Sequence, residues 1–162
     1  MFAPVPKGGF LSRRIWIIVL LAVVAGALAV VLSVLAATGP ATIRITDVQT
    51  ADTLVDRGDR GIQAGDLEII RQLLYNRRVS SSPIGRSYIL CTMLTKSMRM
   101  CTATYTLPKG TLVTSVTTGT RLLYEAAITG GTELYNNARG ALVVTTTALK
   151  PRREVLVFRL AG

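Results

Sequence analysis

Short strand-like runs separated by turn residues constrain the fold of this chain more than any other feature. The segment from Ile43 to Val48 alternates apolar and polar residues, as a strand with one buried face does. Turns between runs are marked by Leu107-Pro108-Lys109-Gly110 and by Gly130-Gly131, while residues 51–65 lack sustained periodicity and are expected to be an exposed loop. The pattern is typical of an all-β sandwich or closed antiparallel barrel. Further strands are expected at residues 67–75, 86–95, 100–107, 111–116, 121–128, 140–149 and 154–160.

A long apolar run precedes these strands. Residues 15–37 contain no charged side chain. At about 1.5 Å per residue, such a helix reaches across a hydrocarbon core of roughly 30 Å. We therefore expect a transmembrane helix at 15–37 and a linker at 38–42, followed by the barrel domain at 43–162. A cleaved signal peptide is the alternative, because small residues that suit cleavage stand near Ala36 and Ala37.

The charges that flank the apolar run predict its orientation. Lys7, Arg13 and Arg14 lie before it, and basic residues favour the cytoplasmic side. We expect a basic cytoplasmic N-terminus at residues 1–14 and a single-pass cell-membrane protein with its barrel outside the cytoplasm. The pair Arg13-Arg14 is also similar to a twin-arginine export signal, although two arginines before an apolar helix are common.

The composition excludes several kinds of chemistry. The chain has no histidine, which removes the usual general base, the Ser/His and Cys/His nucleophile pairs and most zinc sites. It also lacks phosphate-binding and dinucleotide-binding motifs, so we expect no cofactor and no metal. The net charge is +10, but the basic residues are scattered singly or in pairs without interleaved aromatics. That pattern favours a solvated surface near a membrane over a nucleic-acid partner.

Cys91 and Cys101 are the only cysteines and lie on two consecutive expected strands. If the hairpin turns near Lys96-Ser97, the two residues fall opposite one another. A disulfide is the natural interpretation in an exported domain. Two buried free thiols or one reactive cysteine are the alternatives.

Several motifs, taken in order, resemble the allene oxide cyclase barrel superfamily, which also contains plant dirigent proteins and actinobacterial relatives. They are the segment 127–132, Tyr135, Ala138-Arg139-Gly140 and the Leu107–Gly110 turn. The resemblance covers roughly residues 43–160 and implies an eight-stranded antiparallel barrel. Glu133 is a departure, because the family usually has glycine there and a positive φ is strained for any other residue.

The resemblance also implies a function. Its relatives fold a reactive, flexible substrate inside the barrel and bias ring closure. We therefore expect a cofactor-independent cyclase for a hydrophobic, polyketide-like or oxylipin-like substrate. The basic charge of the domain would suit an anionic head group on that substrate. A non-catalytic dirigent-like or lipid-binding surface barrel is the alternative, and a structural barrel with a filled interior is a third. Plant relatives form trimers, so a homo-oligomer is one of the assemblies that the resemblance allows.

Candidate site residues follow from charge and strand position. A carboxylate inside an apolar barrel has its pKa raised by burial or is held ionised by an arginine, and in either state it can steer proton transfer. Glu68 and Glu125 lie within expected strands, and Arg139 is a candidate partner; these three are the catalytic candidates. An exposed or salt-bridged role is the alternative for each of them. The tyrosines are candidates for substrate-binding walls or hydroxyl donors, with core packing as their alternative: Tyr75, Tyr88, Tyr105, Tyr124 and Tyr135.

Overall fold

The computed structural model describes residues 41–58, 61–76, 79 and 82–161. The expected cytoplasmic N-terminus, the transmembrane helix at 15–37 and most of the linker lie outside this range. Within it, no helix is long and apolar enough to cross a membrane.

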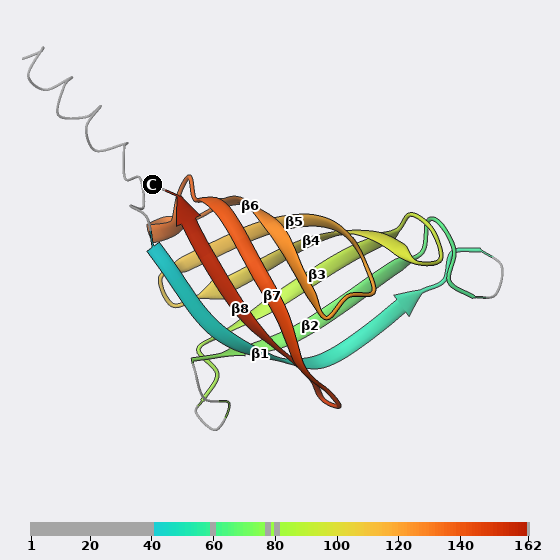
Figure 1. Ribbon diagram of the computed structural model, residues 1–162, viewed down its shortest axis with the longest axis horizontal. Coiled ribbons are helices and arrows are strands. Elements are labelled where there is room, and N and C mark those ends of the chain that lie inside the picture. The colour runs from blue at the N-terminus through green and yellow to red at the C-terminus, as the bar shows by residue number, and fades with distance from the viewer. Residues whose placement is uncertain (1–40, 59–60, 77–78, 80–81, 162) are drawn as a thin grey trace, which may run out of the picture. The chain divides into compact units, whose positions relative to one another are not determined.

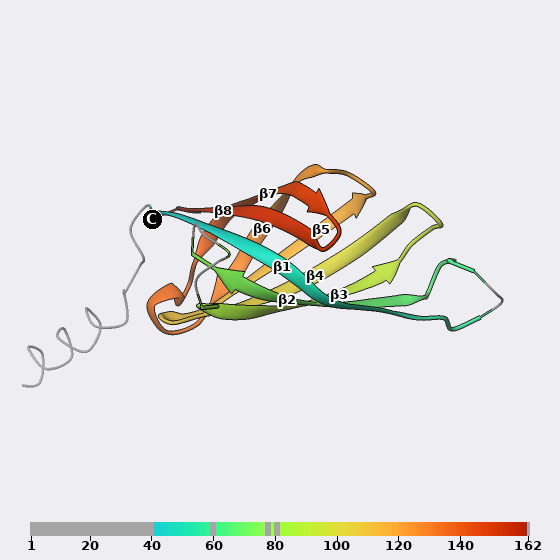
Figure 2. The same cartoon turned by 90° about the horizontal axis from the view of Figure 1, so that it is seen from below.

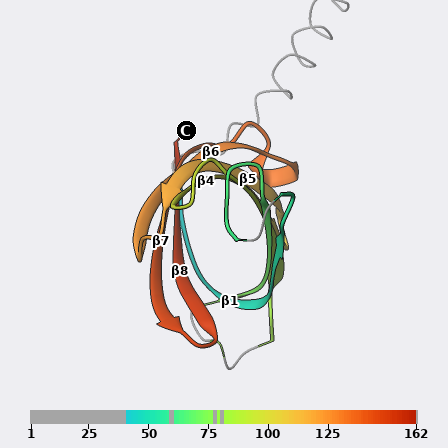
Figure 3. The ribbon, with the colours of Figure 1, turned by 90° about the vertical axis from the view of Figure 1, so that its right-hand side faces the viewer.

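The described residues form a closed antiparallel barrel in which each strand pairs with the next and β8 returns to pair with β1 (Figure 1). The expected all-β, eight-stranded barrel is confirmed. Figure 3 shows the strands forming a ring around the interior. The strands are β1 (Ala41–Val55), β2 (Leu67–Tyr75), β3 (Gly85–Met93), β4 (Met98–Leu107), β5 (Gly110–Gly119), β6 (Leu123–Gly131), β7 (Arg139–Leu149) and β8 (Arg152–Ala161), with a short 3-10 helix, η1 (Glu133–Tyr135), before β7.

Strand β1 is longer than the sequence pattern predicted. Residues 51–55, expected in a loop, continue β1 and pair with β2 as far as Val55 opposite Leu67. A register shift between Gln49 and Ala51 interrupts the ladder. Residues 52–55 are exposed, so they show no alternation between a buried and an exposed face. Backbone pairing alone makes this segment a strand, and Figure 2 shows it running beside β2 to the loop that joins them.

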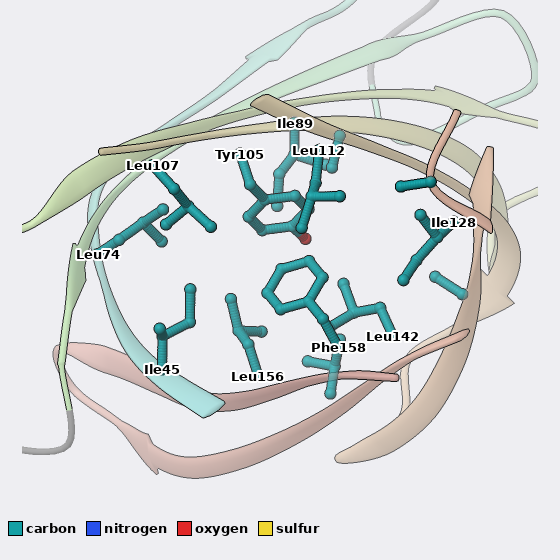
Figure 4. Packing of buried hydrophobic residues seen from close by; sticks show 14 of the residues in the cluster. Ile45, Leu74, Ile89, Tyr105, Leu107, Leu112, Ile128, Leu142, Leu156 and Phe158 are labelled. Atoms are coloured by element: carbon teal, nitrogen blue, oxygen red, sulfur yellow. The ribbon is translucent and has the colours of Figure 1, made fainter. Parts of the chain in front are cut away.

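The barrel interior has an apolar half, which lies where β1 begins and β8 ends. We call this the closed end of the barrel, and the opposite end the open end. The rings of Tyr105 and Phe158 meet edge to face there, with centroids 5.1 Å apart, a favoured aromatic geometry. Figure 4 shows these side chains converging from opposite walls. The most deeply buried large side chains are Phe158, Leu74, Leu112, Leu142, Leu156 and Val144.

Residues 37–162 form a compact unit of their own. Among the described residues, this unit holds all the strand pairs and the buried apolar cluster. Burial of each large apolar side chain contributes about 1.5–3 kcal/mol. We therefore expect this unit to fold by itself.

The expected disulfide is confirmed. Cys91 on β3 lies directly opposite Cys101 on β4, and their sulfur atoms are 2.04 Å apart. The bond joins the two strands of this hairpin on the inner face of the barrel, since both residues are buried.

Two backbone features occur in the glycine-rich motif near η1. Gly140 has φ of 136°, and a Cβ atom there would overlap the carbonyl oxygen of Arg159 on the neighbouring strand. This position therefore excludes other residues. Glu133 stands where the family that the chain resembles usually has glycine, and its φ is 54°. Its backbone is therefore in the left-handed region, which is strained for a residue with a Cβ atom, as expected from the sequence.

We predict that Glu133→Gly stabilises the barrel by about 1 kcal/mol, because glycine adopts a positive φ without the steric penalty that other residues incur. Chemical denaturation of the barrel domain measures this difference. Glu133→Ala is the matched control, since it removes the charge but keeps a Cβ atom. An equal gain in both variants would assign the effect to charge and not to backbone strain.

Candidate functional site

The open half of the barrel encloses a small cavity. Its volume is about 30 Å³, and its walls combine apolar side chains with Gln72, Tyr105, Tyr124 and Glu154. Outside it, at the open end, lies a recess of about 240 Å³ lined by Glu68 and Lys96, among others. Arg99 and Arg152 line both spaces. These two guanidinium groups therefore stand between the interior and the recess.

Glu154 is the polar centre of the cavity wall. Its Oε1 atom accepts a hydrogen bond from Nε of Arg152 at 2.8 Å and forms an ion pair with Nη2 of the same residue at 2.7 Å. The Thr146 hydroxyl donates to the same oxygen at 3.2 Å, and the Gln72 amide donates to the other oxygen at 3.4 Å. Burial lowers the pKa of Arg152, but its attraction to Glu154 outweighs this and leaves that pKa raised. The arginine is thus a permanent cation paired with a buried carboxylate.

Asp47 lies directly opposite Glu154 across the β1–β8 ladder. Its Oδ1 accepts a hydrogen bond from the Glu154 backbone N–H at 3.0 Å, while its Oδ2 is buried and has no hydrogen-bond partner among the described residues. Burial, followed by repulsion from Glu154, raises the pKa of Asp47 to about 8. Near neutral pH this carboxyl group therefore holds a proton beside the ion-paired carboxylate of Glu154.

A hydrogen-bonded chain extends from Glu154 across β2 to β3. The Gln72 side chain bonds Glu154 through its nitrogen, and its oxygen accepts a 2.6 Å hydrogen bond from the Ser87 hydroxyl. Both residues are buried. Because one amide donates to a carboxylate and accepts from a hydroxyl, the orientation of Gln72 is fixed, and it supports the position of Glu154.

Two tyrosines complete the polar part of the cavity. Burial is the main cause that raises the pKa of Tyr105 and of Tyr124. Their hydroxyl groups consequently stay protonated at physiological pH and are available as hydrogen-bond donors. Together with Glu154, they give the cavity two hydrogen-bond donors and an acceptor without any histidine.

The wall of the barrel is least continuous between β5 and β6. Residues 112–115 of β5 pair with residues of β6, with a register shift after Val113. No ladder pair joins the described residues 116–119 to β6. Val116 and Thr118 on one side of this seam, and Tyr124 and Ala126 on the other, line the cavity. The seam therefore lacks the backbone bonds that hold the other walls together.

The structure distributes the catalytic candidates from the sequence over different parts of the barrel. Glu68 is half-buried at the recess and forms an ion pair with Arg99. Glu125 is exposed on the outer face. Arg139 is also exposed, and its guanidinium donates to the carbonyl oxygens of Thr129 and Ala138. Only Glu68 is thus near the open end of the lumen.

The five tyrosines separate in the same way. Tyr105 and Tyr124 line the cavity. Tyr135 belongs to the apolar cluster at the closed end, Tyr75 is half-buried and Tyr88 is 48% exposed. Two of the five therefore contribute to the site that the geometry defines.

The alternation of residues along β1 and β8 indicates that Asp47 and Glu154 point inward, although neither was among the candidates from the sequence. Asp47 falls on the same face of its strand as Ile43 and Ile45, and Glu154 on the same face as Leu156 and Phe158. A carboxylate in register with apolar residues points toward the core. Reading the faces strand by strand would have placed both groups inside.

The raised pKa of Asp47 predicts how stability depends on pH. Its ordinary value is 3.8 and the folded value is about 8, so between these values the folded chain binds the proton more tightly than the unfolded chain. Stability should fall as the pH rises from about 4 to 8, by at most about 1.4 kcal/mol per pH unit. Asp47→Asn should flatten this slope in chemical denaturation, whereas Asp52→Asn, at an exposed position, should retain it. An unchanged slope in Asp47→Asn would contradict the assignment.

Comparison with known proteins supports the fold. No family model matches the chain, and no curated protein matches it in sequence. A solved pyocyanin demethylase is 26% identical, with a TM-score of 0.61 over 72% of this chain and 98% of its own. A pterocarpan synthase dirigent protein is 14% identical, with a TM-score of 0.59 over 76% and 97%. A Diels–Alderase from Streptomyces koyangensis is 19% identical, with a TM-score of 0.60 over 76% and 69%.

These neighbours belong to one barrel superfamily, and they include cyclases as well as dirigent proteins. The resemblance suggested by the motifs of the chain is confirmed at the level of the fold: the chain has the eight-stranded barrel that this dirigent protein and this Diels–Alderase also have.

Proposed function

We propose that this protein is a cofactor-independent cyclase that folds a reactive hydrophobic substrate in its lumen and directs stereoselective ring closure. The polyketide-like or oxylipin-like class expected from the sequence suits the apolar walls. The observation that carries the proposal is the buried Glu154 carboxylate at the cavity, paired with Arg152 and adjacent to the protonated Asp47. Carboxyl groups with separated protonation states are typical of acid–base sites.

Each cavity residue has a role in this proposal. The apolar walls, including Ile70, Ile89 and Leu142, would hold a flexible chain in a conformation close to that of the product, which lowers the entropic cost of ring closure. The Tyr105 and Tyr124 hydroxyls would donate to an oxygen that gains negative charge in the transition state. Glu154 would take a proton from the carbon next to a substrate carbonyl, that carbon would bond to a second carbonyl carbon, and Glu154 would return the proton to the oxygen that becomes the product hydroxyl. Arg152 and Gln72 would keep the carboxylate in place.

The cavity must widen for a substrate of this class to enter. Ligand sites usually have volumes of about 300–1,000 Å³, far above the 30 Å³ of the lumen. Outward movement of Arg99 would join the lumen to the recess, because its side chain lines both spaces, while Arg152 stays paired with Glu154. The β5–β6 seam is the part of the wall best suited to open, because no ladder pair joins the described residues 116–119 to β6.

The small cavity favours a second candidate function. A barrel whose lumen stays this narrow would serve as a non-catalytic dirigent-like or lipid-binding surface module. In that case, the buried polar groups would stabilise the fold and would not handle protons. The two functions differ in whether the barrel accelerates a reaction and selects among its products.

An achiral linear diketone that carries a carboxylic acid and cyclises slowly by aldol addition provides the test, because its uncatalysed product is racemic. We predict that the barrel domain accelerates cyclisation of at least one member of a chain-length series and yields an enantiomeric excess, measured by chiral chromatography. Glu154→Gln should slow the reaction by about 10²-fold, the usual contribution of a positioned acid or base.

Glu125→Gln is the matched control, since it changes an exposed carboxylate on the outer face and should leave rate and selectivity unchanged. A racemic product formed at the uncatalysed rate across the series would reject the cyclase. If product selectivity survived in Glu154→Gln, the barrel would act by shape alone.

A further inference from the structure

A groove on the outside of the barrel has the size of a small-molecule site. It runs along β2 and β3, which lie side by side in Figure 1, and its volume is about 430 Å³. Ligand pockets usually have volumes of roughly 300–1,000 Å³, whereas the lumen cavity has only about 30 Å³. We call this space the outer groove. Its lining includes Thr50, Arg71, Leu73, Ile84, Arg86 and Tyr88.

The register of β2 and β3 brings two arginines to the same part of the outer groove. Arg71 lies directly opposite Tyr88, and Leu73 lies directly opposite Arg86, so the two arginines are diagonal neighbours. Diagonal neighbours on adjacent strands are roughly 7–8 Å apart, which long side chains can span. All four residues alternate along their strands with buried ones, so their side chains lie on the outer face of the barrel.

Neither of these two arginines has an anionic partner among the described residues, where the ion pairs involve Arg99 and Arg152 instead. The lumen cavity, the open-end recess and a groove between β1 and the β7–β8 turn differ in this respect. Each has a carboxylate in its lining, from Glu154, Glu68 and Asp52 respectively. The outer groove has two cations and no described carboxylate, and this charge favours an anionic ligand.

The remaining surface of the outer groove is largely apolar. Leu73 and Tyr88 lie beside the arginines in the ladder, and Pro83 and Ile84 line the groove where β3 begins. Tyr88 is 48% exposed, so part of its ring is accessible to a ligand. Apolar and aromatic walls with a few charged groups are typical of small-molecule sites. The groove therefore suits a ligand with an anionic head and an apolar or aromatic body.

The irregularity in β1 supplies the third wall of the outer groove. Thr50 is left out of the β1–β2 ladder at the register shift between Gln49 and Ala51. Its hydroxyl donates to the carbonyl oxygen of Arg71 at 3.0 Å, which joins the bulge to a strand that carries one of the arginines. Bulges are frequent beside functional sites, where they redirect a side chain.

We propose that the outer groove binds a phosphate monoester that carries an apolar or aromatic group. Such a phosphate has a charge of about −1.5 to −2 at pH 7, which matches the two guanidinium groups. Its oxygens accept the paired hydrogen bonds that a guanidinium group donates, while the apolar group lies against Leu73 and Tyr88. This site is separate from the lumen, so a cyclase function is not required for it.

Isothermal titration calorimetry of the full chain in a nonionic detergent tests the site with phenyl phosphate. Phenyl sulfate has the same ring but a single negative charge, and we expect it to bind roughly tenfold more weakly. Inorganic phosphate lacks the ring and should also bind more weakly. Equal affinities for phenyl phosphate and phenyl sulfate, or no measurable binding of millimolar phenyl phosphate, would overturn the proposal.

Two charge-matched double variants locate the binding. Arg71→Gln with Arg86→Gln should weaken phenyl phosphate binding by about tenfold or more, because both sets of charged hydrogen bonds are lost. Arg121→Gln with Arg153→Gln removes the same charge from exposed positions outside the groove and should change the affinity by less than about twofold, since distant charges are screened. Circular dichroism checks that both variants are folded. Equal losses in the two would assign the attraction to net charge and reject the site.

Competition against phenyl phosphate distinguishes the two sources of a phosphate monoester, a soluble compound and a lipid head group. Dihexanoyl phosphatidic acid carries the monoester on a lipid backbone. If it competes more strongly than unlabelled phenyl phosphate, the natural ligand is a lipid, and if it competes less strongly, the ligand is a soluble compound. Dihexanoyl phosphatidylglycerol is a phosphate diester with one charge and should compete weakly. Competition by this diester equal to that of phosphatidic acid would contradict recognition of a monoester.

Discussion

Closure of the barrel between β1 and β8 is the constraint on which the rest of this domain depends. Residues 41–48 pair with residues 153–160, and that ladder places Asp47 directly opposite Glu154. Both side chains then point inward, because alternate residues of a closed sheet face the interior. Both side chains are buried, and burial together with the nearby Glu154 raises the pKa of Asp47. The same backbone pairing that completes the fold thus creates its most unusual chemical feature.

The sequence predicted the strands well and the interior less well. Alternating residues and turn motifs sufficed for eight strands and for the Cys91–Cys101 pair, since those signals are local. The inner face of each strand depends on register, and a shift of one residue turns Glu125 outward while its neighbours Tyr124 and Ala126 face in. The end of β1 could not be predicted, because residues 52–55 are exposed and only backbone pairing holds them in the sheet.

The two halves of the interior resist opening to different degrees. At the closed end, Phe158, Leu112 and Leu142 are fully buried against one another, and separating them would expose apolar surface at about 25 cal/mol per Å². At the open end, Arg99 lines the lumen, is ion-paired with Glu68 and stays partly exposed, so it regains water when it moves outward. Partly solvated ion pairs contribute little net stability. The open half is therefore where a substrate could displace protein groups without unfolding the core.

This division along the axis also determines how a substrate would reach the lumen. The recess is lined by three cations, Lys96, Arg99 and Arg152. In the proposed reaction, the anionic head group of an amphiphile would pair with these cations while its apolar part replaces the aliphatic stem of Arg99 in the lumen. A purely apolar molecule would make no such ion pair. The charge of the recess thus favours an amphiphilic acid over a purely apolar substrate.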